Sequence, residues 1–131
     1  MSLLGIDIGT TGCKSGVFSE DGRLLASAYE EYDFQRPQPG WAQLDSVEVW
    51  EKIKRTIRQV VAQAGAASPG DPVKALAASS LGESSVPVTR DRQILGPSLL
   101  NFDVRGQEYM ADLSRVIDVE RVYRINGNLW G

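Results

Sequence analysis

The sequence predicts an α/β or α+β domain whose sheet begins with an antiparallel hairpin. Three observations support this class. Two short runs of β-favouring residues, at 3–8 and 13–18, flank a glycine-rich turn near the N-terminus. An amphipathic helical pattern starts after residue 45, and a strand of small residues follows it at 73–80. The expected order of elements is β-β-β-α-β-β-β-α.

Tight turns are expected between the three opening strands. Residues 3–8 are mostly apolar and predict a largely buried strand, residues 13–18 predict its partner, and residues 23–32 predict a longer third strand. The first turn, at 9–12, has the sequence Gly-Thr-Thr-Gly. The second turn, at 20–22, ends in Asp-Gly, a pair that tolerates positive φ and is typical of hairpins.

A single long helix is expected next, after a loop at 34–44 that contains two prolines and a glycine. Asp45 can cap the helix, Glu48 can complete a capping box, and Gly65 is a natural C-cap. Apolar residues recur at helical spacing and predict one buried face of the helix, to which Trp50 belongs. That face consists of Trp50, Ile53, Ile57, Val60, Val61 and Ala64.

The elements after the small-residue strand are expected to be shorter. A loop at 81–85 leads into a short strand at 86–89, and another short strand lies at 99–100. A helix is predicted over 104–117, and a shorter one from Asp118 to near Gly127. The inner face of the first of these helices is expected to carry Tyr109, Met110, Leu113, Val116 and Ile117.

Composition excludes several classes of function. A length of 131 residues suggests one domain or part of one, which is small for an enzyme that encloses two substrates. A net charge of -3 leaves no basic field for nucleic acid or an anionic membrane. No apolar run reaches the ~18 residues of a membrane span, and the N-terminus lacks the basic start of a signal peptide. Cys13, the lone cysteine, fits a small buried filler in a reducing cytosol, and the absence of histidine excludes histidine triads and most zinc sites. We therefore expect a cytoplasmic protein.

The most informative motif is Asp-Ile-Gly-Thr-Thr-Gly-Cys-Lys at 7–14. A Rossmann fingerprint does not fit, because the glycines have the wrong spacing and a strand follows them instead of a helix. A Walker loop does not fit, because Lys14 lacks the preceding glycine. The remaining interpretation is a strand-turn-strand phosphate clamp.

Each residue type in this motif suits a bound phosphate. The glycines let the backbone come close to the ligand, and consecutive N–H groups in such a turn form an anion-binding concavity. Thr10 and Thr11 add hydroxyl donors, and Lys14 adds a positive charge. Asp7 repels phosphate unless Mg²⁺ lies between the two groups. A plain β-hairpin explains the glycines but not the conjunction of Asp7, two threonines and Lys14.

At this motif the chain resembles the superfamily of sugar kinases, actin and heat-shock-chaperone ATPases, and further along it is similar to the FGGY carbohydrate kinases in particular. The loop at 39–45, followed by a helix with Trp50, resembles the family's Gly-Trp-x-x-x-Asp segment. Residues 74–80 resemble the strand that delivers the sugar-binding loop, and residues 95–105 resemble the Asp-x-Arg segment. The resemblance implies an RNase H-like (actin-like ATPase) α/β fold, of which this chain is part of the first domain.

The resemblance also implies ATP and Mg²⁺ as cofactors. Asp7 would hold Mg²⁺, directly or through water, near the transferred phosphate. Thr10, Thr11 and Gly12 would contact the ATP phosphates, and Lys14 would be directed at the same phosphates.

On the substrate side, the resemblance places Gly82 and Glu83 in a sugar-binding loop and Asp103 with Arg105 near the sugar pocket. A solvated turn is the competing interpretation for the glutamate, and a local ion pair is the competing one for Asp103. Trp41 is interpreted as a loop anchor. Glycerol kinases have Arg-Glu in the loop and xylulose kinases have Met-His, whereas this chain keeps only the glutamate. The tryptophan-containing pair before Asp-x-Arg is also absent, so neither glycerol nor xylulose is assigned.

The implied activity is transfer of the γ-phosphoryl group of ATP to the hydroxyl of a small sugar or polyol. The family's catalytic aspartate lies beyond residue 131, and the domain that covers the nucleotide is missing. The segment 126–131 also looks like a break in mid-structure. We therefore expect residues 1–131 to be an incomplete N-terminal domain that is inactive alone. An incomplete domain exposes apolar surfaces, so self-association into a homo-oligomer is a further expectation that stays open.

Two other functions compete with this one. The first is a non-catalytic sugar- or phosphate-binding regulatory module of the same superfamily. The second is a chaperone-like ATPase, against which the Gly-Trp loop and the Asp-x-Arg segment argue. The presence or absence of an aspartate in the catalytic position separates the kinase from the binding module.

Overall fold

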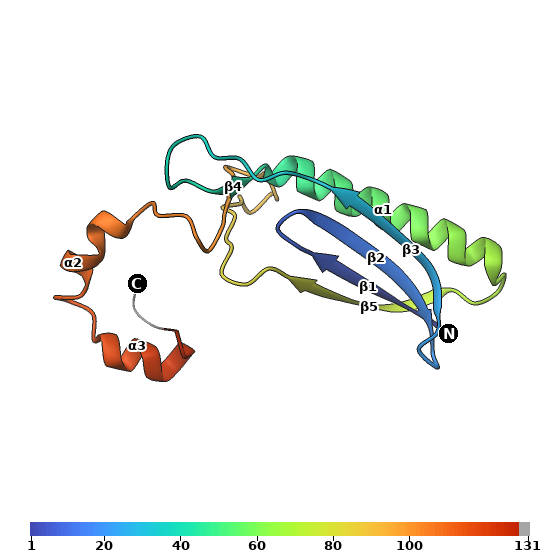
Figure 1. Ribbon diagram of the computed structural model, residues 1–131. Coiled ribbons are helices and arrows are strands. Elements are labelled where there is room, and N and C mark those ends of the chain that lie inside the picture. The colour runs from blue at the N-terminus through green and yellow to red at the C-terminus, as the bar shows by residue number, and fades with distance from the viewer. Residues whose placement is uncertain (129–131) are drawn as a thin grey trace.

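The computed structural model describes residues 1–128 and contains a four-stranded sheet, a long helix against it and a C-terminal arm (Figure 1). The strand order is β3-β2-β1-β5. Strand β2 is antiparallel to both β1 and β3, whereas β5 is parallel to β1. The predicted α/β class and its opening hairpin are confirmed. The strands are β1 (Ser2–Ile8), β2 (Gly12–Ser19), β3 (Leu24–Glu31) and β5 (Val73–Ser80).

Helix α1 (Ser46–Ala67) lies along one face of the sheet (Figure 1). Asp45 caps it as predicted, because its carboxylate accepts hydrogen bonds of 3.0 Å from two backbone N–H groups of the first turn. The predicted C-cap at Gly65 is wrong, and the helix ends at Ser68 instead. Gly65 stays within the helix, and the C-cap Ser68, with φ of -138°, donates its backbone N–H to the Ala64 carbonyl.

The buried face of α1 is narrower than the sequence predicts. Its buried residues are Ser46, Ile53, Thr56, Val60 and Ala64. The prediction that Trp50 and Val61 belong to the core is wrong, because they are 52% and 41% exposed. Trp50 does not face the sheet but lines an open groove of about 330 Å³ together with Val86 and Val88.

Small residues of β2 let α1 pack closely on the sheet. Cys13 and Ser15 are fully buried there, and the Ser15 and Thr56 hydroxyl oxygens are hydrogen-bonded at 2.8 Å. This bond satisfies two polar groups that would otherwise be costly to bury. Burial raises the pKa of the Cys13 thiol, which therefore stays protonated, as expected of a buried filler.

A second sheet consists of two short strands, β4 (Gln43–Leu44) and β6 (Ser98–Leu99). It joins the loop before α1 to the segment near the predicted strand at 99–100. The predicted strand at 86–89 is wrong, because this segment forms a single isolated bridge, between Val88 and Ile94. Pro87 lies within it, and proline has no N–H group to donate to a ladder.

The predicted helix at 104–117 is also wrong. The segment forms a 3₁₀ turn, η1 (Gln107–Tyr109), followed by a single α-helical turn, α2 (Met110–Leu113). The expected inner face is not buried, since Tyr109 is 61% and Val116 is 81% exposed. Short helices are marginal in water without a packing partner, so apolar spacing alone does not produce a continuous helix here.

Helix α3 (Val119–Asn126) forms as predicted. The Asp118 carboxylate caps it by accepting a hydrogen bond of 3.0 Å from the Arg121 backbone N–H, and Gly127 ends it with φ of 75°. Neither α2 nor α3 contains a buried residue, and the arm they form extends away from the sheet (Figure 1).

No helix within residues 1–128 is long and apolar enough to cross a membrane. Half of the segment 126–131, where a break is expected, lies outside the described residues, and Asn126 still belongs to α3.

Candidate functional site

The predicted site residues gather at one end of the sheet. Strands β1 and β5 are parallel, so their carboxyl ends point the same way, and Ile8 pairs with Ser80. The turn at 9–11 and the loop at 81–85 leave these neighbouring strand ends, joined by a hydrogen bond of 2.9 Å from the Leu81 N–H to the Ile8 carbonyl. Ligands of open α/β sheets bind outside the carboxyl ends of the strands.

The absence of a side chain at Gly12 lets the Tyr29 ring pack against it. A Cβ atom there would lie 2.6 Å from the Tyr29 ring, far inside van der Waals contact. A Cβ atom on Gly9 would lie 3.2 Å from the Gly12 carbonyl oxygen, and the Gly9 N–H donates to that same oxygen at 2.9 Å. The turn is therefore tight, and within it Thr11 is exposed whereas Gly12 is buried.

The donors of the two threonines of the turn are not used within residues 1–128. Among the described residues, none accepts a hydrogen bond from the backbone N–H or the hydroxyl of Thr10 or Thr11. Two adjacent N–H groups and two hydroxyls in one tight turn form a concavity suited to an anion. This arrangement fits the phosphates of a nucleotide.

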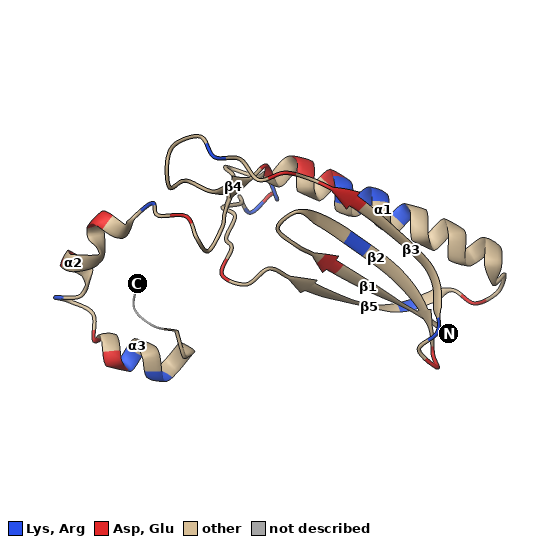
Figure 2. Ribbon diagram, in the orientation of Figure 1, with Lys and Arg blue, Asp and Glu red and all other residues tan. Residues whose placement is uncertain are grey.

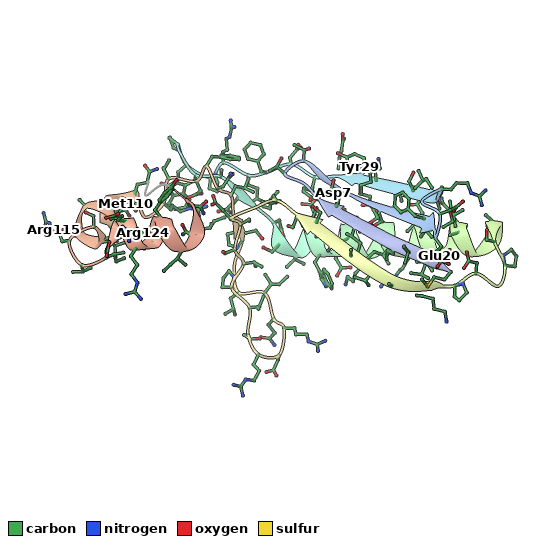
Figure 3. All side chains as sticks on the ribbon, turned by 90° about the horizontal axis from the view of Figure 1, so that it is seen from below. Asp7, Glu20, Tyr29, Met110, Arg115 and Arg124 are labelled. Atoms are coloured by element: carbon green, nitrogen blue, oxygen red, sulfur yellow. The ribbon has the colours of Figure 1, made fainter. Side chains whose placement is uncertain are left out.

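Asp7 and Lys14 lie opposite each other on β1 and β2, where Figure 2 shows an acidic and a basic position side by side. Both residues are exposed, and neither forms an ion pair with another residue of the described chain. Figure 3 shows Asp7 and Tyr29 near one end of the sheet and Glu20 at the other. One cation and one carboxylate are thus available beside the turn.

The donor set around Asp7 fits a magnesium ion that is shared with a phosphate. No group of three or more histidine, cysteine or acidic residues able to hold a metal occurs among residues 1–128. Mg²⁺ usually keeps several waters and is held by one or two carboxylates plus substrate phosphates. A single exposed carboxylate next to a turn whose threonine donors have no acceptor among the described residues fits that requirement.

The open face of the sheet, opposite α1, has a groove of about 440 Å³ that reaches this end. Asp7 and Lys14 lie at its edge, and small residues such as Gly5, Gly16 and Ala77 form part of its floor. The groove brings the charged pair within reach of a ligand larger than a phosphate.

Gly82 and Glu83 are exposed in the loop after β5. Glu83 takes φ of 61°, a left-handed conformation that is uncommon for a residue with a side chain. Its carboxylate accepts a hydrogen bond from the Asn128 side-chain amide. The structure thus brings this loop to the same end of the sheet as the turn at 9–12, which we call the phosphate turn after its predicted ligand. The predicted contact of the loop with a sugar stays a prediction.

Asp103 is committed to contacts within the protein. Its side chain is 3% exposed and accepts hydrogen bonds from the Ala42 N–H at 2.7 Å and from the Arg105 N–H and Nε at 2.8 and 2.9 Å. The Arg105 guanidinium, with these backbone N–H groups, holds the pKa of the Asp103 carboxyl well below its usual range. This geometry favours the local ion pair over direct contact with a substrate.

The Asp103–Arg105 pair also holds the loop before α1. The Arg105 guanidinium carbon lies 4.3 Å from the centre of the Trp41 ring, and Nη1 donates to the Gln43 side-chain oxygen at 3.0 Å. Trp41 therefore anchors its loop, as predicted.

One residue at the turn was not predicted. The Tyr32 hydroxyl donates to the Gly9 carbonyl at 2.7 Å, and the Tyr32 N–H donates to the Thr11 carbonyl at 3.1 Å. Tyr32 is 3% exposed, and burial raises its pKa to about 12. The available signal was the length of the third predicted strand, whose end must return to the turn if it pairs fully with the second strand.

Comparison with known families and sequences identifies relatives along most of the chain. The model of the FGGY family of carbohydrate kinases, N-terminal domain, matches residues 2–130. Glycerol kinase from Leptospira biflexa is 36% identical over 84 residues, which cover 64% of this chain and 16% of that protein. Glycerol kinase from Paracidovorax citrulli is 42% identical over 84 residues, again covering 64% of this chain and 16% of the relative. The chain thus spans a small part of these relatives.

Solved structures share the fold. The xylulose kinase from Rhodospirillum rubrum has a TM-score of 0.84 at 22% identity, over 94% of this chain and 25% of that one. The Plasmodium falciparum glycerol kinase with ADP has a TM-score of 0.88 at 16% identity, over 99% of this chain and 26% of that one. The predicted RNase H-like, actin-like fold class is confirmed by these likenesses.

Proposed function

The chain belongs to the FGGY family of carbohydrate kinases, and on that basis we propose that it is the phosphate-binding part of an enzyme that transfers the γ-phosphoryl group of ATP to a sugar or polyol hydroxyl. One observation carries the proposal. Asp7 and Lys14 lie opposite each other beside a turn whose threonine N–H groups and hydroxyls have no acceptor among the described residues.

In this proposal, Thr10, Thr11, Gly12 and Lys14 bind the ATP phosphates and Asp7 holds Mg²⁺. The ion, when bound, supplies charge neutralisation at the transferred phosphate. The turn fixes the direction of the phosphate chain, and the Lys14 ammonium offsets its negative charge. Phosphoryl transfer depends on positioning and electrostatic stabilisation more than on covalent chemistry, and these residue types supply both.

On the acceptor side, we assign Gly82 and Glu83 to the sugar or polyol. A carboxylate can accept hydrogen bonds from two neighbouring hydroxyls, and this loop starts beside the phosphate turn. Asp103, predicted as a substrate-binding residue, is instead assigned to holding the loop at Trp41 together with Arg105. Its oxygens already accept bonds from the protein, and its side chain is 3% exposed.

We further propose that residues 1–131 are an incomplete N-terminal domain of a larger cytoplasmic kinase. The relatives above are several times longer than the stretch they share with this chain, since the shared part is 16% of each glycerol kinase. A general base and a second domain covering the nucleotide would belong to the remainder. The isolated chain is accordingly expected to bind ATP without phosphorylating a sugar.

The test is a titration of the chain with Mg-ATP, followed through the backbone amide resonances of Thr10 and Thr11. An open, wet site predicts a dissociation constant in roughly the millimolar range, or about 4 kcal/mol. Asp7→Ala should weaken binding at least several-fold, whereas Glu20→Ala, at the opposite end of the sheet, should leave it unchanged. Equal binding by wild type and Asp7→Ala would contradict the role of Asp7.

A coupled assay with a panel of sugars and polyols completes the test. No sugar-dependent ADP production is expected from the isolated chain. Production that disappears in Asp7→Ala would show that residues 1–131 form a complete enzyme. Mg-ATP binding in a longer protein without any phosphorylated product would instead favour the non-catalytic binding module.

A further inference from the structure

We propose that Tyr32 is a positioning residue for the phosphate turn: it fixes two peptide units of the turn, and by holding the first of them it directs the Thr10 N–H toward the ligand. The proposal rests on the proposed phosphate-binding function of the turn. One residue reaches both of its ends, because the Tyr32 hydroxyl donates to the Gly9 carbonyl at 2.7 Å and the Tyr32 N–H donates to the Thr11 carbonyl at 3.1 Å.

The planarity of the peptide bond makes these contacts directional. In a trans peptide unit the C=O and the following N–H point in opposite directions, and no cis peptide bond occurs among the described residues. Holding the Gly9 carbonyl toward Tyr32 therefore directs the Thr10 N–H away from the protein interior. Holding the Thr11 carbonyl fixes the orientation of the Gly12 N–H in the same way.

Tyr32 is itself held in place. It is 3% exposed and follows β3, and its ring lies 5.9 Å from the Lys52 ammonium of α1. Lys52 also donates to the Glu31 carbonyl, next to Tyr32, and pairs with Glu48 one helical turn earlier. Helix α1 thus reaches the phosphate turn through Tyr32, although no residue of α1 belongs to the turn.

Removal of the hydroxyl should release one peptide unit and leave the fold intact. Tyr32→Phe keeps the buried ring but leaves the Gly9 carbonyl without its donor. One hydrogen bond of ordinary strength corresponds to roughly a five- to ten-fold change in an equilibrium constant. The Thr10 N–H then samples several directions, and the affinity for a phosphate ligand falls accordingly.

A matched control is present on the neighbouring strand. The Tyr29 hydroxyl lies 3.5 Å from the Thr11 carbonyl oxygen, too long for a strong hydrogen bond, and the residue is 54% exposed. Tyr29→Phe removes the same atom from the same neighbourhood without removing a comparable contact. A general effect of losing a hydroxyl near the turn would appear in both variants.

The experiment measures amide hydrogen exchange and Mg-ATP affinity in wild type, Tyr32→Phe and Tyr29→Phe. The Gly9 N–H donates to the Gly12 carbonyl across the turn, so it reports how firmly the turn is held when the Gly9 carbonyl loses its donor. In Tyr32→Phe we expect exchange of the Gly9 amide to accelerate roughly five- to ten-fold beyond any change at Val17 in the core, and the dissociation constant of Mg-ATP to rise by a similar factor. Tyr29→Phe should change each by less than about two-fold. A uniform acceleration at Gly9 and Val17 with unchanged affinity means a purely structural role and overturns the proposal.

The outcomes separate this inference from the proposed function. If Mg-ATP does not shift the turn amides of the wild type, phosphate binding by the turn fails, and with it the positioning role. If Mg-ATP binds equally well to wild type and Tyr32→Phe, only the role of Tyr32 fails. If Tyr32→Phe does not fold, the exchange of the Tyr32 hydroxyl proton with water is measured in the wild type instead. Slow exchange of this proton supports the hydrogen bond to Gly9, and exchange too fast to give a separate signal contradicts it.

Discussion

The phosphate turn is fixed by the strands around it, whereas the loop after β5 is held at its ends and, between them, by one exposed contact of Glu83 with Asn128. Three hydrogen bonds hold the turn, two of them from Tyr32 and one between Gly9 and Gly12. The loop at 81–85 is bonded through Leu81 and, at its other end, through Ser84 to the Leu99 carbonyl at 2.7 Å. Glu83 between them is exposed in a left-handed conformation.

This difference indicates which segment loses conformational entropy when a ligand binds. A turn that is already ordered loses little further freedom on binding, whereas an exposed loop loses that freedom when its ligand or another part of the protein arrives. The contrast is stronger along the C-terminal arm, where neither α2 nor α3 contains a buried residue. In the proposed function, the turn assigned to phosphate is thus ordered within this chain, whereas the loop assigned to the acceptor depends on further contacts.

The largest effect is expected at the ordered turn. In a protein that carries this chain and phosphorylates a sugar, Asp7→Ala should lower kcat by roughly 100-fold, equivalent to about 2–3 kcal/mol of transition-state stabilisation. The reason is that a charge-stabilising carboxylate is lost. Steady-state kinetics with Mg-ATP measure it, with Glu20→Ala as the control. A normal kcat in Asp7→Ala would contradict the metal-holding role of Asp7 and the expectation that the largest effect lies beside the turn.

The second effect concerns the contact that holds the loop before α1. Asp103→Asn should lower the free energy of unfolding by about 1.5–3 kcal/mol, because the buried carboxylate loses charge-assisted hydrogen bonds to Arg105. Urea denaturation measures this. Asp112→Asn is the control, because Asp112 also forms an aspartate–arginine pair, with Arg115, but on the exposed arm. Equal changes in the two variants would mean that the Asp103 pair is no stronger than a surface pair.

The same residue predicts a pH dependence. The pKa of Asp103 is lowered in the folded state, so its contribution to stability is fully present above the unfolded pKa near ~3.9 and is lost as the pH falls below it. The stability of the wild type should therefore decrease with acid more steeply than that of Asp103→Asn. Parallel pH profiles between pH 5 and the acid limit of folding would contradict the assignment.

The sequence could predict the ordered half because its residues are close together in the chain. Asp7, Thr10, Thr11 and Lys14 fall within one hairpin, so a local register places them side by side. Tyr32 could not be placed, because its contact depends on the register of β2 with β3, which shifts between Val17 and Phe18.

The wrong predictions concern segments whose structure depends on their packing partners. The apolar spacing at 104–117 resembles a helix face, but the structure gives that face nothing to pack on, and Val116 is 81% exposed. Trp50 follows the helical period of the core residues and yet lies beside a groove, because the neighbouring segment at 86–94 does not cover it. Periodicity reports which residues could be buried together, and the tertiary neighbours determine which of them are.

A smaller effect is expected in the exposed loop. Glu83→Ala should raise the KM for the sugar or polyol by roughly ten-fold, since one charge-assisted hydrogen bond is lost, and should leave the KM for ATP unchanged. Kinetics of the sugar-phosphorylating protein with each substrate varied in turn measure this. If both constants keep their wild-type values, Glu83 is a solvated turn residue and the acceptor lies elsewhere.

The smallest effect is expected on the arm, and it tests whether the arm contributes to the fold at all. Val116 is 81% exposed, whereas Val60 is fully buried under the sheet. Val116→Ala should therefore change the free energy of unfolding of the isolated chain by less than about 0.5 kcal/mol, and Val60→Ala should lower it by about 2 kcal/mol, through lost burial and the cavity left behind. Chemical denaturation compares the two at several protein concentrations. A cost at Val116 that approaches the cost at Val60, or that grows with concentration, would show that the arm is covered in solution, by the sheet in the first case and by a second copy of the chain in the other.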